Sequence, residues 1–201
     1  MKTVNHSNAD MTFVFGITLL IFLLVTIAYP AMAGSIDVFE GDEWDFFVGK
    51  KEPPPKWNHI GFDKPDKNWI KGRTGIGYGH ERVRTELDDM RNNYRTIYAR
   101  RNLTLSKTAH EFLQQDSVNI TASIVCNGSF KVWLNGIEVI RSQNERGGLG
   151  AQVQQASEID ITDFAQELLL IGENVLAVEC SNDDIDSGSF LFIPTLRVMG
   201  R

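Results

Sequence analysis

The sequence predicts an all-β fold, an antiparallel β-sandwich with one or two short helices. From Tyr94 onward, runs of alternating apolar and polar residues follow one another: YRTIYARRNLTL, SVNITASIVC, FKVWL, IEVIR, NVLAVEC and SFLFIPTLRV. Short strands of period two with turn residues between them are typical of antiparallel sandwiches and barrels. The apolar fraction of 42% and the charged fraction of 23% are ordinary for a globular protein, so we expect a folded chain.

The first 33 residues are predicted to be a signal peptide or a signal anchor, followed by a single domain over residues 34–201. Residues 11–29 contain no charge, and the pattern AMA stands before Gly34, as at a signal-peptide cleavage site. The apolar run is also long enough to span a bilayer, so an uncleaved anchor is the alternative. Both readings predict export to the periplasm, the cell surface or the medium, with membrane contact only through this segment if it is uncleaved.

Residues 39–79 are rich in aromatic and turn residues. Three of the four tryptophans lie in this segment, among many Gly, Pro and Asp residues, which predicts loops that join short strands. Exposed aromatic rings can stack on the apolar faces of sugars. The candidates for such a carbohydrate-binding role are Trp57, Trp69, Tyr78 and Trp133, and the alternative for each is a place in the core.

The stretch FKVWLNGIEVIR, residues 130–141, predicts a hairpin. Asn135-Gly136 favours a two-residue type I′ turn, which pairs Leu134 with Ile137. Continuing this register pairs Val132 with Val139 and turns Ile137 and Val139 toward the core. Trp133 and Ile140 then lie on the opposite face.

Two short helices are expected. One lies in SKTAHEFLQQ, with Ser106 as the N-cap; the other lies in TDFAQELLLIGEN, capped by Thr162 or Asp163 and stopped by Gly172. The two cysteines, Cys126 and Cys180, stand in predicted strands. They either pair, if those strands are neighbours, or remain buried free thiols.

Charge argues against nucleic acid as a partner. The net charge is −6, whereas affinity for a phosphate backbone requires clustered Lys and Arg. No G-x-S-x-G motif is present, and Gln114 replaces the second histidine of a zinc-protease helix that would begin at His110.

The densest acidic cluster is NDDIDSG, residues 182–188. Asp183, Asp184 and Asp186 offer oxygen ligands for a structural Ca²⁺, although the spacing is not that of an EF-hand. The alternative is a solvated turn between two strands, and no cofactor is firmly indicated. A separate group of carboxylates, comprising Asp42, Glu43, Asp45, Asp63 and Asp66, stands among the aromatic residues, where paired carboxylates would suit a small glycoside hydrolase.

Several segments together resemble a known family. They are DEWDFFVGKKEPPPKW, FDKPDKNWIKGRTGIGYGH, TIYARRNLTL, FKVWLNGIEVIR, EIDITDFAQELLLIGENVLAVECSNDD and SFLFIPTLRV, and they cover about residues 42–198. In order and spacing they resemble the galactose-binding-domain-like jelly rolls that are appended to many secreted bacterial enzymes and act like carbohydrate-binding modules. The V-x-L-N-G hairpin and the L-x-x-G-x-N-x-L-A-V entry are also similar to those of the sugar-binding domain of family 2 glycosidases.

This resemblance implies a jelly roll and a carbohydrate ligand. The chain departs from the family pattern at Cys126-Asn127-Gly128 and at Cys180-Ser181-Asn182, and the paired change to cysteine favours a disulfide. We therefore expect an exported, non-catalytic module that binds carbohydrate or cell-surface glycan. The alternatives are a structural or adhesion protein of the cell envelope, which acts through protein–protein contacts, and a small glycoside hydrolase.

Overall fold

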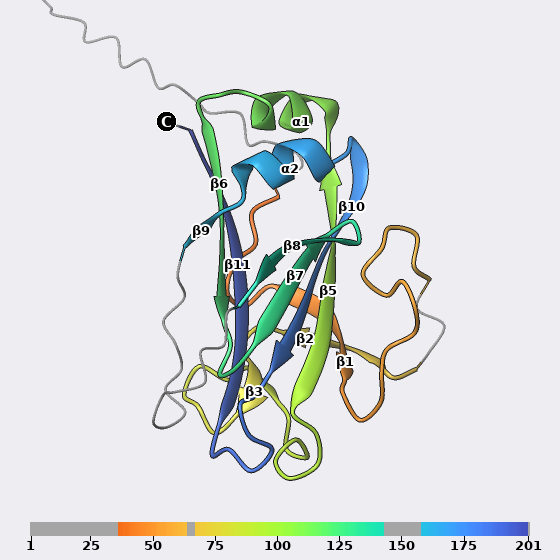
Figure 1. Ribbon diagram of the computed structural model, residues 1–201, viewed down its shortest axis with the longest axis vertical. Coiled ribbons are helices and arrows are strands. Elements are labelled where there is room, and N and C mark those ends of the chain that lie inside the picture. The colour runs from red at the N-terminus through yellow and green to blue at the C-terminus, as the bar shows by residue number, and fades with distance from the viewer. Residues whose placement is uncertain (1–35, 64–66, 143–157, 201) are drawn as a thin grey trace, which may run out of the picture. The chain divides into compact units, whose positions relative to one another are not determined.

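The computed structural model describes residues 36–63, 67–142 and 158–200, and it shows two β-sheets and two short helices (Figure 1). In spatial order, sheet one contains β2 (Trp69–Arg73), β1 (Glu43–Val48), β5 (Thr96–Leu105), β10 (Gly172–Ser181), β7 (Phe130–Leu134) and β8 (Ile137–Arg141). Sheet two contains β4 (Thr85–Glu86), β3 (Ile76–Tyr78), β11 (Phe190–Gly200), β6 (Val118–Val125) and β9 (Ile159–Asp160). The predicted all-β sandwich with two short helices is confirmed.

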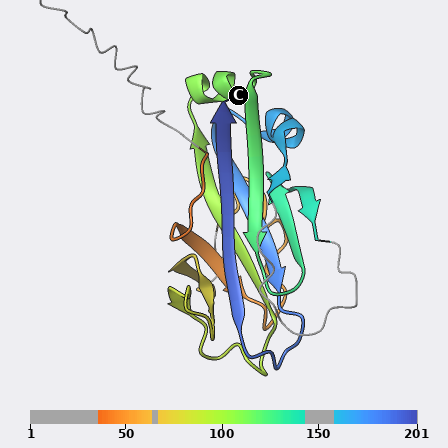
Figure 2. The ribbon, with the colours of Figure 1, turned by 90° about the vertical axis from the view of Figure 1, so that its left-hand side faces the viewer.

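Nearly all strand pairs are antiparallel, and the exception among the described strands is the short parallel pair of β3 with β4. Figure 2 shows β11 and β6 side by side in sheet two, where they pair from Ile193–Val125 to Gly200–Val118. The predicted signal segment, residues 1–33, lies outside the described residues. Across the ranges that are described, no helix is long and apolar enough to cross a membrane.

The alternation of each strand decides which side chains enter the core. On β5, Ile97 and Ala99 are fully buried between the two sheets, while Tyr98 and Arg100 point to the outer face of sheet one. Among the described residues, the largest side chain that is fully buried is Trp44, whose ring meets Phe192 of sheet two edge-on at 5.9 Å between ring centroids. Burial of apolar surface on this scale is the main stabilising contribution to the fold.

Both helices lie at one end of the sandwich (Figure 1). α1 (Lys107–Leu113) begins as predicted, because the Ser106 hydroxyl accepts a hydrogen bond from the Ala109 amide at 3.1 Å. α2 (Thr162–Leu168) departs from the prediction, since its N-cap residue is Ile161 rather than Thr162 or Asp163. There the preceding Asp160 carboxylate accepts from the Thr162 amide at 2.9 Å and provides the capping bond.

The hairpin register is only partly as predicted. The Leu134–Ile137 and Trp133–Glu138 pairs form, with Asn135 and Gly136 at positive φ as a type I′ turn requires. A β-bulge then shifts the register, so that Val132 pairs with Ile140 instead of Val139. The expectation that Ile137 faces the core is wrong, since it is 53% exposed, and Ile140 is the buried residue.

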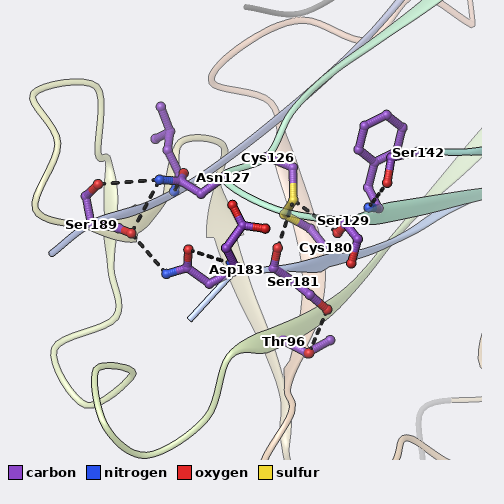
Figure 3. The surroundings of a disulfide bond; sticks show 12 residues. Thr96, Cys126, Asn127, Ser129, Ser142, Cys180, Ser181, Asp183 and Ser189 are labelled. Atoms are coloured by element: carbon purple, nitrogen blue, oxygen red, sulfur yellow. Dashed lines mark hydrogen bonds between the residues drawn. A yellow bond between two sulfur atoms is a disulfide. The ribbon is translucent and has the colours of Figure 1, made fainter. Parts of the chain in front are cut away.

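Cys126 and Cys180 form a disulfide that joins the two sheets (Figure 3). Cys126 follows the last residue of β6 in sheet two, and Cys180 lies on β10 in sheet one, with their Cα atoms 6.1 Å apart. Both residues are buried. The sulfur of Cys126 also lies near the carbonyl oxygens of Ser129 and Ser181, at 3.4 and 3.5 Å.

Candidate binding site

The loop from β1 to β2 folds over the outer face of sheet one and forms what we call the aromatic cap, residues 50–63 (Figure 1, orange to gold). Its central side chain is Trp57, which is 9% exposed. The Trp57 ring lies edge-on to Tyr98 and to Trp133, with 5.5 Å between ring centroids in both pairs. A third neighbour, Trp69, is 6.1 Å away.

The structure therefore brings Trp57, Trp69 and Trp133 together, as one cluster. Their rings pack on each other and on Phe47 and Phe62; Trp57 is buried, whereas Trp69 and Trp133 are half-buried. Edge-to-face packing of this kind stabilises a small second core. Tyr98 ties this second core to the cap, because its hydroxyl donates to the Glu52 carboxylate at 3.1 Å. Burial raises the pKa of this tyrosine well above its usual range.

Tyr78 lies apart from this cluster. It belongs to β3 of sheet two, is 9% exposed, and its hydroxyl donates to the Ser187 carbonyl at 2.8 Å. Burial is also the main reason that the pKa of Tyr78 is raised. This tyrosine anchors the loop between β10 and β11 and does not share a site with the tryptophans.

The three aspartates predicted as Ca²⁺ ligands lie in that same loop. Two arginines hold the backbone of this loop. The Arg91 guanidinium donates to the backbone carbonyl of Asp186 at 3.0 Å, and the Arg95 guanidinium lies 3.5 Å from the backbone carbonyl of Asp183. Within the described ranges, no three His, Cys, Asp or Glu side chains gather as a metal site would require. Asp183, Asp184 and Asp186 lie in the turn between β10 and β11, and Ca²⁺ binding by their carboxylates stays a prediction.

One row of residues across sheet one connects the aromatic cluster to a group of charges. The strand registers place Lys71 opposite Asp45, Asp45 opposite Arg100, Arg100 opposite Ala177, and Ala177 opposite Trp133. Residues in register on neighbouring strands of a sheet project from the same face. The outer face thus changes from aromatic to charged within one row, and Arg100 stands at the boundary.

Beside the cap, at the start of β1, the surface is hollowed into a pocket of about 410 Å³. It is lined by Asp42, Glu43, Trp44, Asp45, Lys71, Arg100, Arg101 and Asn102. Acidic residues come from β1 and the residue before it, whereas the basic residues and the amide come from β2 and β5. We call this hollow the polar pocket. Its volume lies within the range of small-molecule sites, about 300–1,000 Å³.

The charges that line the polar pocket are largely matched. Lys71 forms an ion pair with Glu43 at 2.7 Å, and this hydrogen bond is the main cause of the lowered pKa of Glu43 and the raised pKa of Lys71. Arg101 lies 3.2 Å from the Asp42 carboxylate and also donates to the Glu43 carbonyl at 3.0 Å. The pocket wall therefore presents hydrogen-bond donors and acceptors without a large excess of either charge.

Sequence reasoning anticipated only part of this pocket. Asp42, Glu43 and Asp45 were in the predicted carboxylate group, but Asp63 does not line the pocket and Asp66 lies outside the described residues. The basic side of the pocket was missed, because the run YARRN was read simply as a strand. Its signal was available: alternation on β5 places Arg100 on the same face as Tyr98, a face that an aromatic loop covers.

No protein-family model matches the sequence, and no curated protein matches it. Solved structures do share its architecture. A glycosyl hydrolase family 2 member from Bacteroides cellulosilyticus aligns with a TM-score of 0.53 at 13% identity, over 82% of this chain and 20% of that chain. A second family 2 member, from Bacteroides cellulosilyticus DSM 14838, gives 0.51 at 14% identity over 82% and 21%, and a β-glucuronidase from Bacteroides uniformis gives 0.51 at 16% over 81% and 17%.

This chain thus spans about a fifth of the length of those proteins. At such low identities the likeness concerns the fold alone. The finer resemblance to galactose-binding modules remains a prediction from sequence motifs. What the comparisons establish is that the chain has the β-sandwich architecture of a domain found within family 2 glycosyl hydrolase chains.

Proposed function

We propose that the chain is an exported, non-catalytic module that binds saccharides in the polar pocket. The observation that carries this proposal is the lining of the pocket: beside Trp44, three carboxylates, three cations and one amide surround about 410 Å³. Carboxylates accept hydrogen bonds, guanidinium and ammonium groups donate them, and the amide does both. A sugar hydroxyl also does both, so a polyhydroxylated ligand can satisfy both sides of the pocket.

The charge balance favours a neutral ligand. Asp42, Glu43 and Asp45 lie between Lys71 of β2 on one side and Arg100 and Arg101 of β5 on the other, so a phosphate or other strongly charged group would leave one set of side chains unmatched. Burying a charge without a partner is costly, whereas a neutral polyol has no such cost. The proposal thus keeps the predicted ligand class and moves its site from the tryptophans to the charged end of the same face.

Export is supported by the disulfide. A buried Cys126–Cys180 bond that joins two sheets is typical of proteins that fold in an oxidising compartment, and it agrees with the predicted signal segment. The partner in this proposal is a carbohydrate or cell-surface glycan. Nucleic acid is not proposed as a partner, because the net charge of −6 opposes it.

A glycan array with the full chain tests the proposal. We expect retention of a subset of neutral glycans, and we expect Asp45→Asn to weaken it by about tenfold or more, since a charged hydrogen-bonding group contributes roughly 1.5–3 kcal/mol. Asp116→Asn, in an exposed turn after α1, is the matched control and should bind normally. A folded wild-type chain that binds no glycan would overturn the proposal.

A second candidate is a structural or adhesion protein of the cell envelope. It is favoured by three apolar side chains near the hairpin turn, Ile137, Leu170 and Ile171, each about half exposed. Exposed apolar groups of this kind are found at protein–protein contacts. If this candidate is right, the triple substitution of these residues by Ser removes cell-surface attachment and leaves glycan binding unchanged.

The hydrolase alternative has less support. A general acid needs a raised pKa, whereas the ion pair with Lys71 lowers the pKa of Glu43. Chromogenic aryl glycosides test it directly. Turnover by the wild-type chain that is lost in Asp45→Asn would show catalysis and contradict the non-catalytic proposal.

A further inference from the structure

Arg100 divides its hydrogen bonds between the aromatic cap and the polar pocket. Toward the cap, Nη1 donates to the Phe62 carbonyl at 3.0 Å and Nη2 donates to the His59 carbonyl at 3.3 Å. Toward the pocket, Nη2 also donates to the Asn102 side-chain oxygen at 3.1 Å. One guanidinium thus contacts both a pocket-lining side chain and two carbonyls of the loop that covers the aromatic cluster.

Arg100 is buried, and its hydrogen-bond donors are incompletely matched. It is only 2% exposed, and the Phe62 ring lies 5.2 Å from its guanidinium carbon. Its Nε–H is buried and has no hydrogen-bond partner among the described residues, and burial lowers the pKa of Arg100 while the charge of Asp45 opposes that shift. A buried guanidinium whose donors are incompletely matched is sensitive to any change in the remaining partners.

We propose that Arg100 is a positioning residue that couples the polar pocket to the aromatic cap. When Asn102 holds the guanidinium, the same group holds the His59 and Phe62 carbonyls and keeps the cap closed. Coupling between two sites is reciprocal, so a cap that is closed also fixes Asn102 at the pocket wall. The functional meaning of this coupling rests on the proposed saccharide binding: a sugar that engages Asn102 tightens the cap.

Two backbone hydrogen bonds within the cap can be used to measure its opening. The Trp57 amide donates to the Pro54 carbonyl at 3.3 Å, and the His59 amide donates to the Lys56 carbonyl at 2.9 Å. Both bonds lie within the cap, so amide hydrogen exchange at these two residues measures local opening of the cap separately from unfolding of the sandwich.

The experiment compares exchange at these two amides in the full chain and its variants, without ligand. In Asn102→Ala we expect exchange to rise by roughly tenfold or more, because one hydrogen bond to a charged donor is lost. Lys71→Met is the matched control: it lies in the same pocket but makes no hydrogen bond to the guanidinium, and exchange should change by less than about twofold.

A double-mutant cycle separates coupling from general loosening. If Asn102 acts on the cap through Arg100, then Asn102→Ala produces no further increase in exchange when it is added to Arg100→Met. Should Arg100→Met fail to fold, Arg100→Lys replaces it, because one ammonium cannot reach all three acceptors and the effect of Asn102→Ala should shrink. An unchanged cap in Asn102→Ala, an equal effect of Lys71→Met, or full additivity would each overturn the coupling.

These outcomes are independent of the glycan array. A chain that shows the non-additive exchange but binds no glycan retains the coupling and loses the proposed function. A chain that binds glycans and shows additive exchange retains the function and loses the role of Arg100.

Discussion

Side chains that alternate along each strand form the two faces of sheet one, and the two faces are covered by different parts of the chain. The inner face is apolar and is covered by sheet two, whose strands bring Phe192 and Leu196 against it. The outer face carries Tyr98 beside Arg100 and is covered by a loop. The second sheet excludes water from most of the inner face, although Ile70 on the edge strand β2 is 45% exposed. The loop covers only part of the outer face, and the polar pocket lies where that cover ends.

The first test of this contrast is truncation of Trp44 in the inner core. The residue is 1% exposed and packs on Phe192, so we expect Trp44→Ala to lower the free energy of unfolding by about 3–5 kcal/mol. Urea unfolding followed by circular dichroism measures it. Trp57→Ala in the cap is the comparison, and it should cost clearly less, because a loop can collapse onto the space it leaves. Equal losses would mean that the cap is as integral to the fold as the inner core.

Removing the disulfide should have the next largest effect. The bond closes a loop with a sequence separation of 54 residues, for which the chain-entropy account gives about 4 kcal/mol, and measured values are typically about 2–4 kcal/mol. The double variant Cys126→Ala, Cys180→Ala should unfold at lower urea concentration than the oxidised wild type. A reductant should destabilise the wild type and leave the double variant unchanged; destabilisation of both would contradict the prediction.

A smaller effect is expected where the hairpin meets the cap. Gly136 has a φ of 91°, and a Cβ there would lie 2.5 Å from the His59 ring. Gly136→Ala should therefore cost about 1–2 kcal/mol for the left-handed backbone plus the displacement of His59. Gly172→Ala is the matched control, since its φ is 95° with open space around it. If thermal unfolding shows the same loss for both variants, the His59 contact contributes nothing.

The smallest predicted effect is the pH dependence of an ion pair at the rim of the inner core. Asp89 accepts from Lys50 at 2.6 Å and from the Tyr94 hydroxyl at 2.9 Å, and the Lys50 bond is the main cause of its lowered pKa. A carboxyl with a lowered pKa stabilises the fold above its ordinary pKa of 3.8, and this contribution disappears as the pH falls through the lowered value. Because the pair is exposed, we expect less than about 1 kcal/mol.

The variant Asp89→Asn tests this. Its stability deficit at pH 7 should shrink as the pH falls below about 4, because the wild-type carboxyl becomes protonated as the pH passes through its lowered pKa. A deficit that stays constant with pH would mean that the amide disturbs packing around Tyr94 instead of removing a charge.

Most of the inner face was predictable from the sequence, apart from the exchange of Ile137 for Ile140, and the loop that covers the outer face was not. Alternation alone places Val132 and Leu134 in the core, and Asn135-Gly136 alone predicts the turn. The environment of Trp133 depends on a loop more than 70 residues earlier in the sequence, because Trp57 of that loop covers it. The local sequence around Trp133 does not predict this contact. The bulge was missed for a related reason: its extra residue, Val139, lies on the edge strand β8, where it disturbs no second partner.

The polar pocket likewise contains residues that the sequence predicted and residues that it did not. The acidic wall at Asp42, Glu43 and Asp45 stood out as a local cluster, and it does line the pocket. Arg100 and Asn102 belong to a strand far along the chain, and they join the site only through the pairing of β5 with β1. The cysteine pair remained open in the sequence because its geometry depends on how the two sheets face each other.

The central position of β10 has a consequence for how the chain folds. β10 pairs with β5 along its whole length, and Thr96 and Ser181, at one end of this ladder, are 85 residues apart in the sequence. Closing such a long loop precedes any gain from the ladder, so a sandwich of this kind folds slowly compared with helical domains of equal size. During synthesis, β5 and β7 lack the strand that lies between them until residue 172 and those after it have been made. The nascent chain therefore remains without a completed sheet, and accessible to chaperones, until its last strands are available.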